Sequence, residues 1–209
     1  TESKSGGNFR AGGVAGYFTS AHSNLVNNGK FEVTSACLIE GSPQIGGVVG
    51  DIYNKGTDLV FDTYTNNGEI IYNAHNKGVL HLGGITSDPY CATMQNMTNN
   101  GAISLNGIYD GPVKVAGCFG YHDKELLILN NCTNNAPITV LGESNSTTAF
   151  YVGGVCLSIQ GKGPHNNIYN TEKGDILVNL SKCVSNVTIA GITNKFQDNS
   201  YDVVNHGDI

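Results

Sequence analysis

TNNGEIIYNAHNKGVLHLGGITS, residues 65–87, decides the fold, because it contains both halves of a pattern that recurs along the chain. One half is a Gly-Gly or Ala-Gly pair between apolar residues. The second residue of this pair is glycine in every copy, at intervals of about 33 to 37 residues, a period typical of solenoid proteins. These glycines are Gly13, Gly47, Gly84, Gly117, Gly154 and Gly191.

The other half of the pattern surrounds a second anchor, which reads VNNGKF at 26–31, TNNGEI at 65–70, TNNGAI at 98–103 and TNNAPI at 133–138. Weaker copies are TEKGDI at 171–176 and VNHGDI at 204–209. Asn and Gly tolerate positive φ, so this anchor is expected to form a corner between strands. We predict that the Asn before the Gly or Ala stacks from turn to turn as an amide ladder, interrupted by Lys173 and His206; the alternative is a row of amides that binds a ligand. The ladder residues are Asn28, Asn67, Asn100 and Asn135.

Between the anchors the chain consists of short stretches rich in β-branched residues, and no segment shows the sustained i, i+3, i+4 spacing of an amphipathic helix. The sequence therefore predicts an all-β, right-handed parallel β-helix, or solenoid, of about six repeats of ~35 residues. It is expected to form one domain over 1–209 and to be a piece of a longer chain. We favour one wide turn per repeat over two compact turns of about 17 residues.

Length varies most after the Gly-Gly pair, and insertions in a solenoid map to loops on one face, where binding often occurs. The variable segments are 51–64, 87–95, 121–129 and 158–169. A tyrosine ring can stack on a sugar or anchor a protein contact. The tyrosines in or near these segments, which we predict to form a binding face, are Tyr53, Tyr64, Tyr90, Tyr109, Tyr121 and Tyr169.

The two-part pattern, with IIYN followed by HLGGITS, and LILNNCTNNAPITV, resembles the GLUG-motif repeats of bacterial surface and secreted proteins, including those of Bacteroides-type bacteria. The resemblance covers nearly the whole chain, and the closing Gly of the motif is lost at GGITS, GGVCL and AGITN. It implies an extracellular or cell-surface region, adhesin-like or stalk-like, often beside a separate catalytic domain.

Catalytic β-helices use clustered carboxylates, and this chain offers Asp51, Asp58 and Asp62 in one segment and His122 beside Asp123 in another. No Asp-Asp pair or catalytic-looking Arg accompanies them, so we interpret them as solvated loop side chains. A polysaccharide hydrolase or lyase remains the alternative function.

Six cysteines occur, none with C-x-x-C spacing, so neither a metal site nor a cofactor is expected. Cys118 and Cys156 follow consecutive Gly anchors at nearly equivalent positions. We expect them to be neighbours in adjacent turns, as buried free thiols rather than as a disulfide.

The net charge of −6 and the lone Arg10 disfavour nucleic acid as a partner, and no apolar run is long enough to span a bilayer. The first hypothesis is a noncatalytic repeat domain that binds a glycan or a surface protein through loops on one face. A third hypothesis is a structural filament subunit, because the ends of a solenoid without polar caps favour end-to-end self-association.

Overall fold

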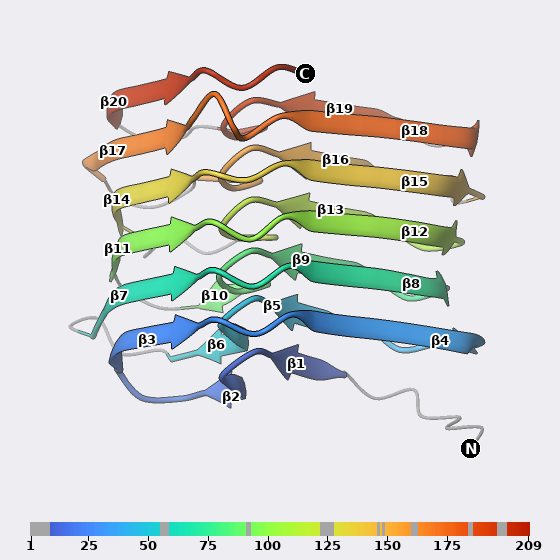
Figure 1. The fold of residues 1–209 in the computed structure, drawn as a ribbon, viewed down its shortest axis with the longest axis horizontal. Coiled ribbons are helices and arrows are strands. Elements are labelled where there is room, and N and C mark those ends of the chain that lie inside the picture. The colour runs from blue at the N-terminus through green and yellow to red at the C-terminus, as the bar shows by residue number, and fades with distance from the viewer. Residues whose placement is uncertain are drawn as a thin grey trace.

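The computed structural model describes residues 9–54, 59–90, 93–121, 128–145, 147, 149–159, 163–183, 186–195 and 200–209. These residues form parallel β-strands and no helix, stacked turn on turn as a solenoid (Figure 1). Paired strands are about one repeat apart in sequence; Gly12 pairs with Gly46, and Asn66 pairs with Asn99. One repeat is therefore one wide turn, and the predicted fold is confirmed.

Each full turn passes through four sheets in the order A, B, C, D. Sheet A contains β1 (Arg10–Gly12), β5 (Gln44–Gly46), β9 (Leu80–Gly83), β13 (Val113–Ala116), β16 (Phe150–Gly153) and β19 (Val187–Ala190). Sheet B contains β2 (Ala15–Phe18), β6 (Val49–Tyr53) and β10 (Pro89–Tyr90). Single bridges extend it through Thr86, Phe119 and Cys156.

Most strands of sheets C and D are longer than those of sheet A, and these two sheets form the face of the solenoid opposite to sheet A. Sheet C contains β3 (Ser23–Asn27), β7 (Val60–Asn66), β11 (Thr93–Asn99), β14 (Ile128–Asn134), β17 (His165–Asn170) and β20 (Ser200–Asn205). Sheet D contains β4 (Phe31–Ile39), β8 (Ile70–Asn76), β12 (Ile103–Tyr109), β15 (Ile138–Ser144) and β18 (Ile176–Cys183).

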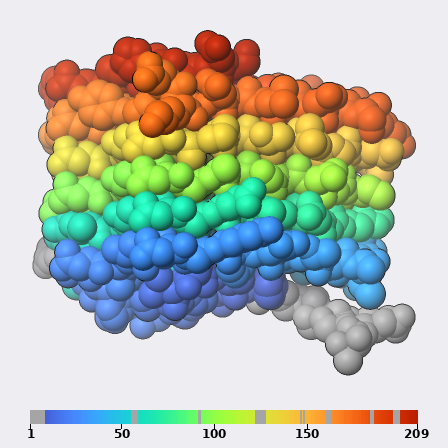
Figure 2. All heavy atoms as spheres, in the orientation of Figure 1, coloured from blue at the N-terminus to red at the C-terminus, as the bar shows by residue number. Residues whose placement is uncertain are grey.

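The coil is right-handed. In Figure 1 the strands of sheets C and D run from left to right in front, those of sheet A run from right to left behind, and the colour rises from blue to red. Figure 2 shows each turn as one band across the front face. Successive bands are one strand spacing apart, ~4.8 Å, so that equivalent residues form columns along the axis.

The core is divided into two clusters. One lies between sheets B and C and includes Val48, Phe61 and Met97, and the other lies between sheets A and D and includes Tyr72 and Leu82. Burial of these apolar columns is the main favourable term in the stability of the fold.

A buried amide ladder lies where sheet C passes into sheet D. Each amide bonds to the next, for example Asn66 Nδ2 to Asn99 Oδ1 at 2.9 Å and Asn99 Nδ2 to Asn134 Oδ1 at 2.9 Å. A Cβ on Gly84 would lie 2.4 Å from Cγ of Asn99, so the second Gly of the pair is required for close contact with the ladder. The ladder residues are Asn27, Asn66, Asn99, Asn134, Asn170 and Asn205.

The amide ladder that the sequence predicted lies one residue later, on the surface. Asn67 donates to Asn28, Asn100 to Asn67 and Asn135 to Asn100, at 2.8–2.9 Å. The ladder is interrupted in the next turn, as predicted, but by Thr171 and not by Lys173. The backbone N–H of Thr171 bonds to the carbonyl of Asn134, so Thr171 follows Asn135 in the column. Two extra residues before Gly174 cause the shift.

The positive φ expected at this corner is found elsewhere. Among the described residues other than glycine, positive φ occurs at the residue four positions before each surface-ladder position. These residues belong to sheet C, and they form a column of their own from turn to turn. At the corner, the buried Asn instead closes a local turn, as when Asn99 accepts from the N–H of Gly101 and donates to its carbonyl. The positive-φ residues are Asn24, Thr63, Asn96, Asn131, Asn167 and Asp202.

The expectation of buried free thiols is confirmed for Cys118 and Cys156, and Cys132 joins them in the same core cluster. Burial raises the pKa of the Cys156 thiol to about 12, opposed by a hydrogen bond with Thr193. A thiol with such a pKa is protonated at neutral pH and therefore unreactive. Cys37 and Cys183 are exposed, and Cys91 lies outside the described residues.

Candidate functional site

The Gly-Gly turn bends the chain sharply between sheets A and B. A Cβ on Gly46 would lie only 1.9 Å from the carbonyl oxygen of Val49, three residues on. In each repeat, the residue three positions before the second Gly belongs to sheet A, and equivalent residues stack from turn to turn as a column. The residue four positions after the second Gly forms a similar column on the sheet B side. We call these the outward columns of the bend. The two columns face the same bend.

A hollow of about 490 Å³ occupies the last three layers of this bend, and we call it the A/B hollow. Its volume lies in the range of small-molecule sites, roughly 300–1,000 Å³. Sheet A contributes Lys114, Tyr151 and Thr188, and the sheet B side contributes Tyr121, Leu157, Ser158, Asn194 and Lys195.

One end of the A/B hollow is formed by a stack of side chains. The ammonium of Lys114, from sheet A, lies 3.3 Å from the ring centroid of Tyr121, on the sheet B side. His81, one layer below Lys114, packs against the same ring with centroids 5.1 Å apart. The cation–π contact holds the ammonium of Lys114 at this end of the hollow.

Two lining residues of the A/B hollow carry buried polar atoms with no hydrogen-bond partner among the described residues. Ser158 is 6% exposed, and its Oγ is buried without a partner. Nδ2 and Oδ1 of Asn194 are also buried without a hydrogen-bond partner. A buried polar group left unpaired costs about 1–3 kcal/mol, and a ligand that hydrogen-bonds to these atoms would remove that cost.

The lower layers of the same bend hold titratable groups. Arg10 Nε lies 2.7 Å from Asp51 Oδ2, and the guanidinium lies 4.5 Å from the ring centroid of Tyr17. Burial raises the pKa of Asp51, and the hydrogen bond and charge of Arg10 oppose this shift. Asp88 pairs in register beside Asp51, one layer up. The bend thus has a carboxylate-bearing lower part and a lysine-bearing upper part.

The structure does not bring the six predicted tyrosines together on one face. Tyr64 and Tyr109 are fully buried in the core, so neither ring can stack on a ligand. Tyr169 lies on sheet C, the other face of the molecule, where its hydroxyl donates to Asn167. Tyr121 lines the A/B hollow.

The remaining predicted tyrosines form a pair at the sheet B edge. Tyr53 and Tyr90 stack with ring centroids 4.9 Å apart. In chain order, the variable segments connect the sheet B side to sheet C, and parts of each lie outside the described residues. Asp58, His122 and Asp123 lie outside the described residues.

The sequence interpretation missed Lys114, Tyr151, Asn194 and Lys195 of the A/B hollow, and it included Ser158 only as the first residue of a variable segment. The sequence did contain a signal for these residues. Lys114 and Tyr151 each lie three residues before the second Gly of their own repeat, and Ser158 and Lys195 each lie four residues after it. Reading these two fixed offsets in every repeat, rather than the variable segments alone, would have identified both walls.

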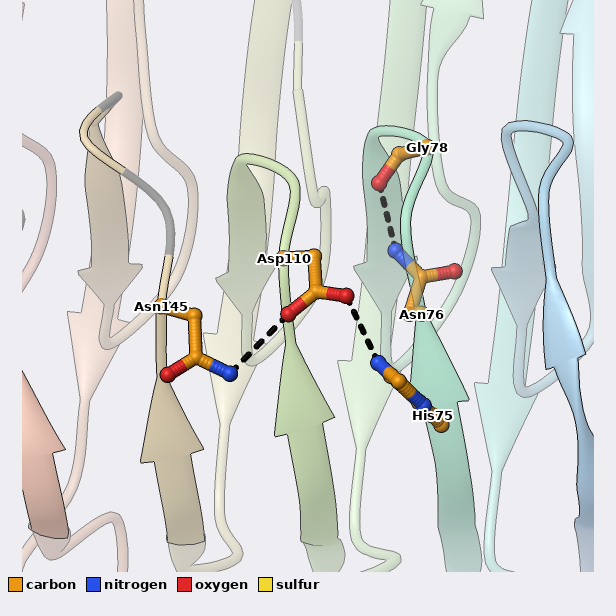
Figure 3. A network of polar contacts seen from close by, with 5 residues as sticks. All are labelled: His75, Asn76, Gly78, Asp110 and Asn145. Atoms are coloured by element: carbon orange, nitrogen blue, oxygen red, sulfur yellow. Dashed lines mark hydrogen bonds and ion pairs between the residues drawn. The ribbon is translucent and has the colours of Figure 1, made fainter.

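Two other polar features lie away from the A/B hollow. At the end of sheet D, Asp110 accepts from Asn145 at 3.0 Å and lies 2.7 Å from Nε2 of His75 (Figure 3). The hydrogen bonds with Asn145 and His75 lower the pKa of Asp110. This network joins adjacent turns and is consistent with a structural role.

A second hollow, of about 590 Å³, lies along the surface amide ladder. It is lined by Asn100, Asn135, Thr171, Glu172 and Lys173. The amides of Asn100 and Asn135 already bond to the ladder, and the two charges have opposite signs, so this hollow offers less for a ligand than the A/B hollow.

Comparison of the chain with family models, curated proteins and solved structures gives no match. The resemblance to GLUG-motif repeats therefore stays a prediction. The part of the chain that the structure describes has no helix long and apolar enough to cross a membrane.

Proposed function

We propose that this domain is a noncatalytic glycan-binding repeat domain whose binding surface is the A/B hollow. The observation that carries the proposal is the combination, in one hollow, of an accessible tyrosine ring at Tyr151 and buried unpaired polar atoms at Ser158 and Asn194. A sugar offers apolar ring faces and many hydroxyls, which match a planar amphipathic ring and scattered hydrogen-bonding groups.

The architecture supports the same proposal. The hollow extends over consecutive layers of a rigid stack, so an extended polymer can cross several turns along one face. We place this domain outside the cell, in an adhesin-like or stalk-like region, on the strength of the motif resemblance and a surface with few charged residues, 13% of the chain.

Binding to soluble polysaccharides, measured by affinity electrophoresis and calorimetry, tests the proposal. Tyr151→Ala should weaken binding about tenfold, because aromatic anchors at the centre of a site contribute more than ~1 kcal/mol. Tyr169→Ala is the matched control, since Tyr169 is a partly exposed tyrosine on the other face, and it should leave binding unchanged. Equal loss in both variants, or no binding to any glycan, would refute the proposal.

A second candidate function is polysaccharide hydrolysis, favoured by the neighbouring carboxylates of Asp51 and Asp88 at the lower end of the same bend. Hydrolases use two carboxyl groups about 5–10 Å apart. Against it, Asp51 is buried and held by Arg10. Release of reducing ends from a bound polymer, abolished in Asp88→Asn, would make this the function; unchanged polymer length supports the binding proposal.

A further inference from the structure

We infer that the glycan bound in the A/B hollow carries an acetamido group, as N-acetylhexosamines do, and that Leu157, Ser158 and Asn194 recognise this group. The inference rests on the proposed function, because it names the class of sugar that the same hollow accepts. The position of the repeat that matters most lies three residues after the second Gly, and we call it the closing position.

The closing position holds a small residue in the lower four turns and a large one in the upper two. In the lower turns the walls of the bend lie close together, since a Cβ on Gly120 would lie 2.3 Å from the carbonyl oxygen of Leu82, on sheet A. A side chain at the closing position therefore needs a wider bend. The closing residues are, in chain order, Gly16, Gly50, Ser87, Gly120, Leu157 and Asn194.

The two turns with a large closing residue are also the upper two of the three turns that line the A/B hollow. Leu157 and Asn194 both line it. They are neighbours along the column, because the backbone N–H of Asn194 bonds to the carbonyl of Leu157. The hollow thus coincides with the departure from the repeat pattern, and these two side chains distinguish it from the bend below.

The chemistry of the closing residues and of Ser158 defines what they can bind. Leu157, which is 4% exposed, contributes an apolar side chain to the lining. Ser158 and Asn194 contribute a buried hydroxyl and a buried amide that have no hydrogen-bond partner among the described residues. A hydroxyl oxygen accepts hydrogen bonds, and an amide nitrogen donates them. The ligand that suits this site therefore has an apolar group, a donor and an acceptor close together.

An acetamido group has all three. Its methyl can pack on Leu157, its N–H can donate to Oγ of Ser158, and its carbonyl can accept from Nδ2 of Asn194. A ring hydroxyl lacks the apolar part, the methyl of a deoxy sugar lacks hydrogen-bonding groups, and an O-acetyl group lacks the donor. Each of these leaves one of the three protein groups without its contact, which is how a polar site rejects a close analogue.

The experiment measures the affinity of the intact chain, by calorimetry and NMR titration, for two pairs of sugars. Chitotetraose and cellotetraose share one linkage and differ only in an acetamido group in place of a hydroxyl. The methyl glycosides of N-acetylgalactosamine and galactose differ in the same way. In at least one pair the acetamido sugar should bind about tenfold more tightly, as expected when a hydrogen bond and a methyl contact are both gained. A preference in neither pair would overturn the inference.

Leu157→Ser and Asn194→Ser should each reduce this preference to about threefold or less, because each removes one contact with the acetamido group. Serine already occupies the closing position at Ser87, so the repeat accepts it there. Leu157→Met keeps an apolar side chain of similar volume and should retain the preference. Thermal unfolding of each variant establishes that the fold is intact, and the ratio of two affinities on the same protein is insensitive to a loss of folded material.

Ser87→Gly is the matched control. Ser87 occupies the closing position in a turn below the hollow, where its hydroxyl donates to the carbonyl of Gly50. This variant should change neither the affinity nor the preference for the acetamido sugar. A loss of preference in Ser87→Gly as large as in Leu157→Ser and Asn194→Ser would show that the preference arises outside the hollow, and the inference would be wrong.

Failure of the inference and failure of the proposed function give different results. If the acetamido and hydroxyl sugars bind equally and Tyr151→Ala weakens binding, the glycan-binding function stands and the acetamido ligand is wrong. If neither these sugars nor any polysaccharide binds, both are wrong.

Discussion

At the scale of single residues, the buried amide ladder is expected to contribute more to the free energy of unfolding than the surface ladder does. Asn99 donates to Gly101 and Asn134 and accepts from Asn66 and from the N–H of Gly101, so every hydrogen-bonding position of its amide is used. Asn100 lies beside it but is exposed to water, which can replace any bond that is lost.

Asn99→Ala is therefore expected to lower the free energy of unfolding by about 3 kcal/mol or more, since it leaves buried backbone and amide groups unpaired on two sides. Asn100→Ala should cost less than about 1 kcal/mol. Urea denaturation followed by circular dichroism measures both. Equal losses would show that the buried ladder has no special role.

At the scale of strands, the sheet C strands contain an irregularity that explains why Tyr64 lies in the core and not on the surface where it was predicted. In β7 both Phe61 and Tyr64 point into the core although they are three residues apart, because Thr63 adopts a φ of 59° between them. The alternation of inward and outward residues is broken at this point. Period-two counting therefore cannot place Tyr64, and tyrosine is equally suited to core and surface.

Thr63 is the β-branched member of the positive-φ column, and a β-branched residue is strained there. Thr63→Asn should raise the free energy of unfolding by about 0.5–1 kcal/mol, because Asn tolerates this conformation and occupies it at Asn96 and Asn131. Thr65→Asn, at a position two residues on in the same strand, is the control and should not stabilise. A loss of stability in Thr63→Asn would contradict this reading of the strand.

The sequence was sufficient for the period, the parallel stacking, the neighbouring thiols and the surface amide ladder, because all of these depend only on which residues recur. It was insufficient for the inward position of Asn66 rather than Asn67, since two adjacent Asn carry the same chemistry and only packing against Gly47 distinguishes them. It also missed the A/B hollow, which is formed by side chains from two sheets that the Gly-Gly bend brings together.

At the scale of the whole molecule, the scaffold and the surface for binding are separable. The Gly-Gly bend and the buried amide ladder recur in every turn, whereas the outward columns of the bend change from Arg10 and Asp51 in the lower turns to Tyr151 and Lys195 in the upper ones. Variation on a constant frame is how a repeat protein acquires a binding surface without altering its fold.

The most direct test of the A/B hollow as a glycan-binding site is NMR mapping of the backbone amides during titration with an oligosaccharide from a polysaccharide that binds. The account predicts that the largest shift changes occur in β13, β16 and β19 and at residues 157–159 and 193–195, with little change in sheets C and D. Shift changes centred on the surface amide ladder or on sheet D, or no changes at all, would contradict the assignment of the A/B hollow as the functional site.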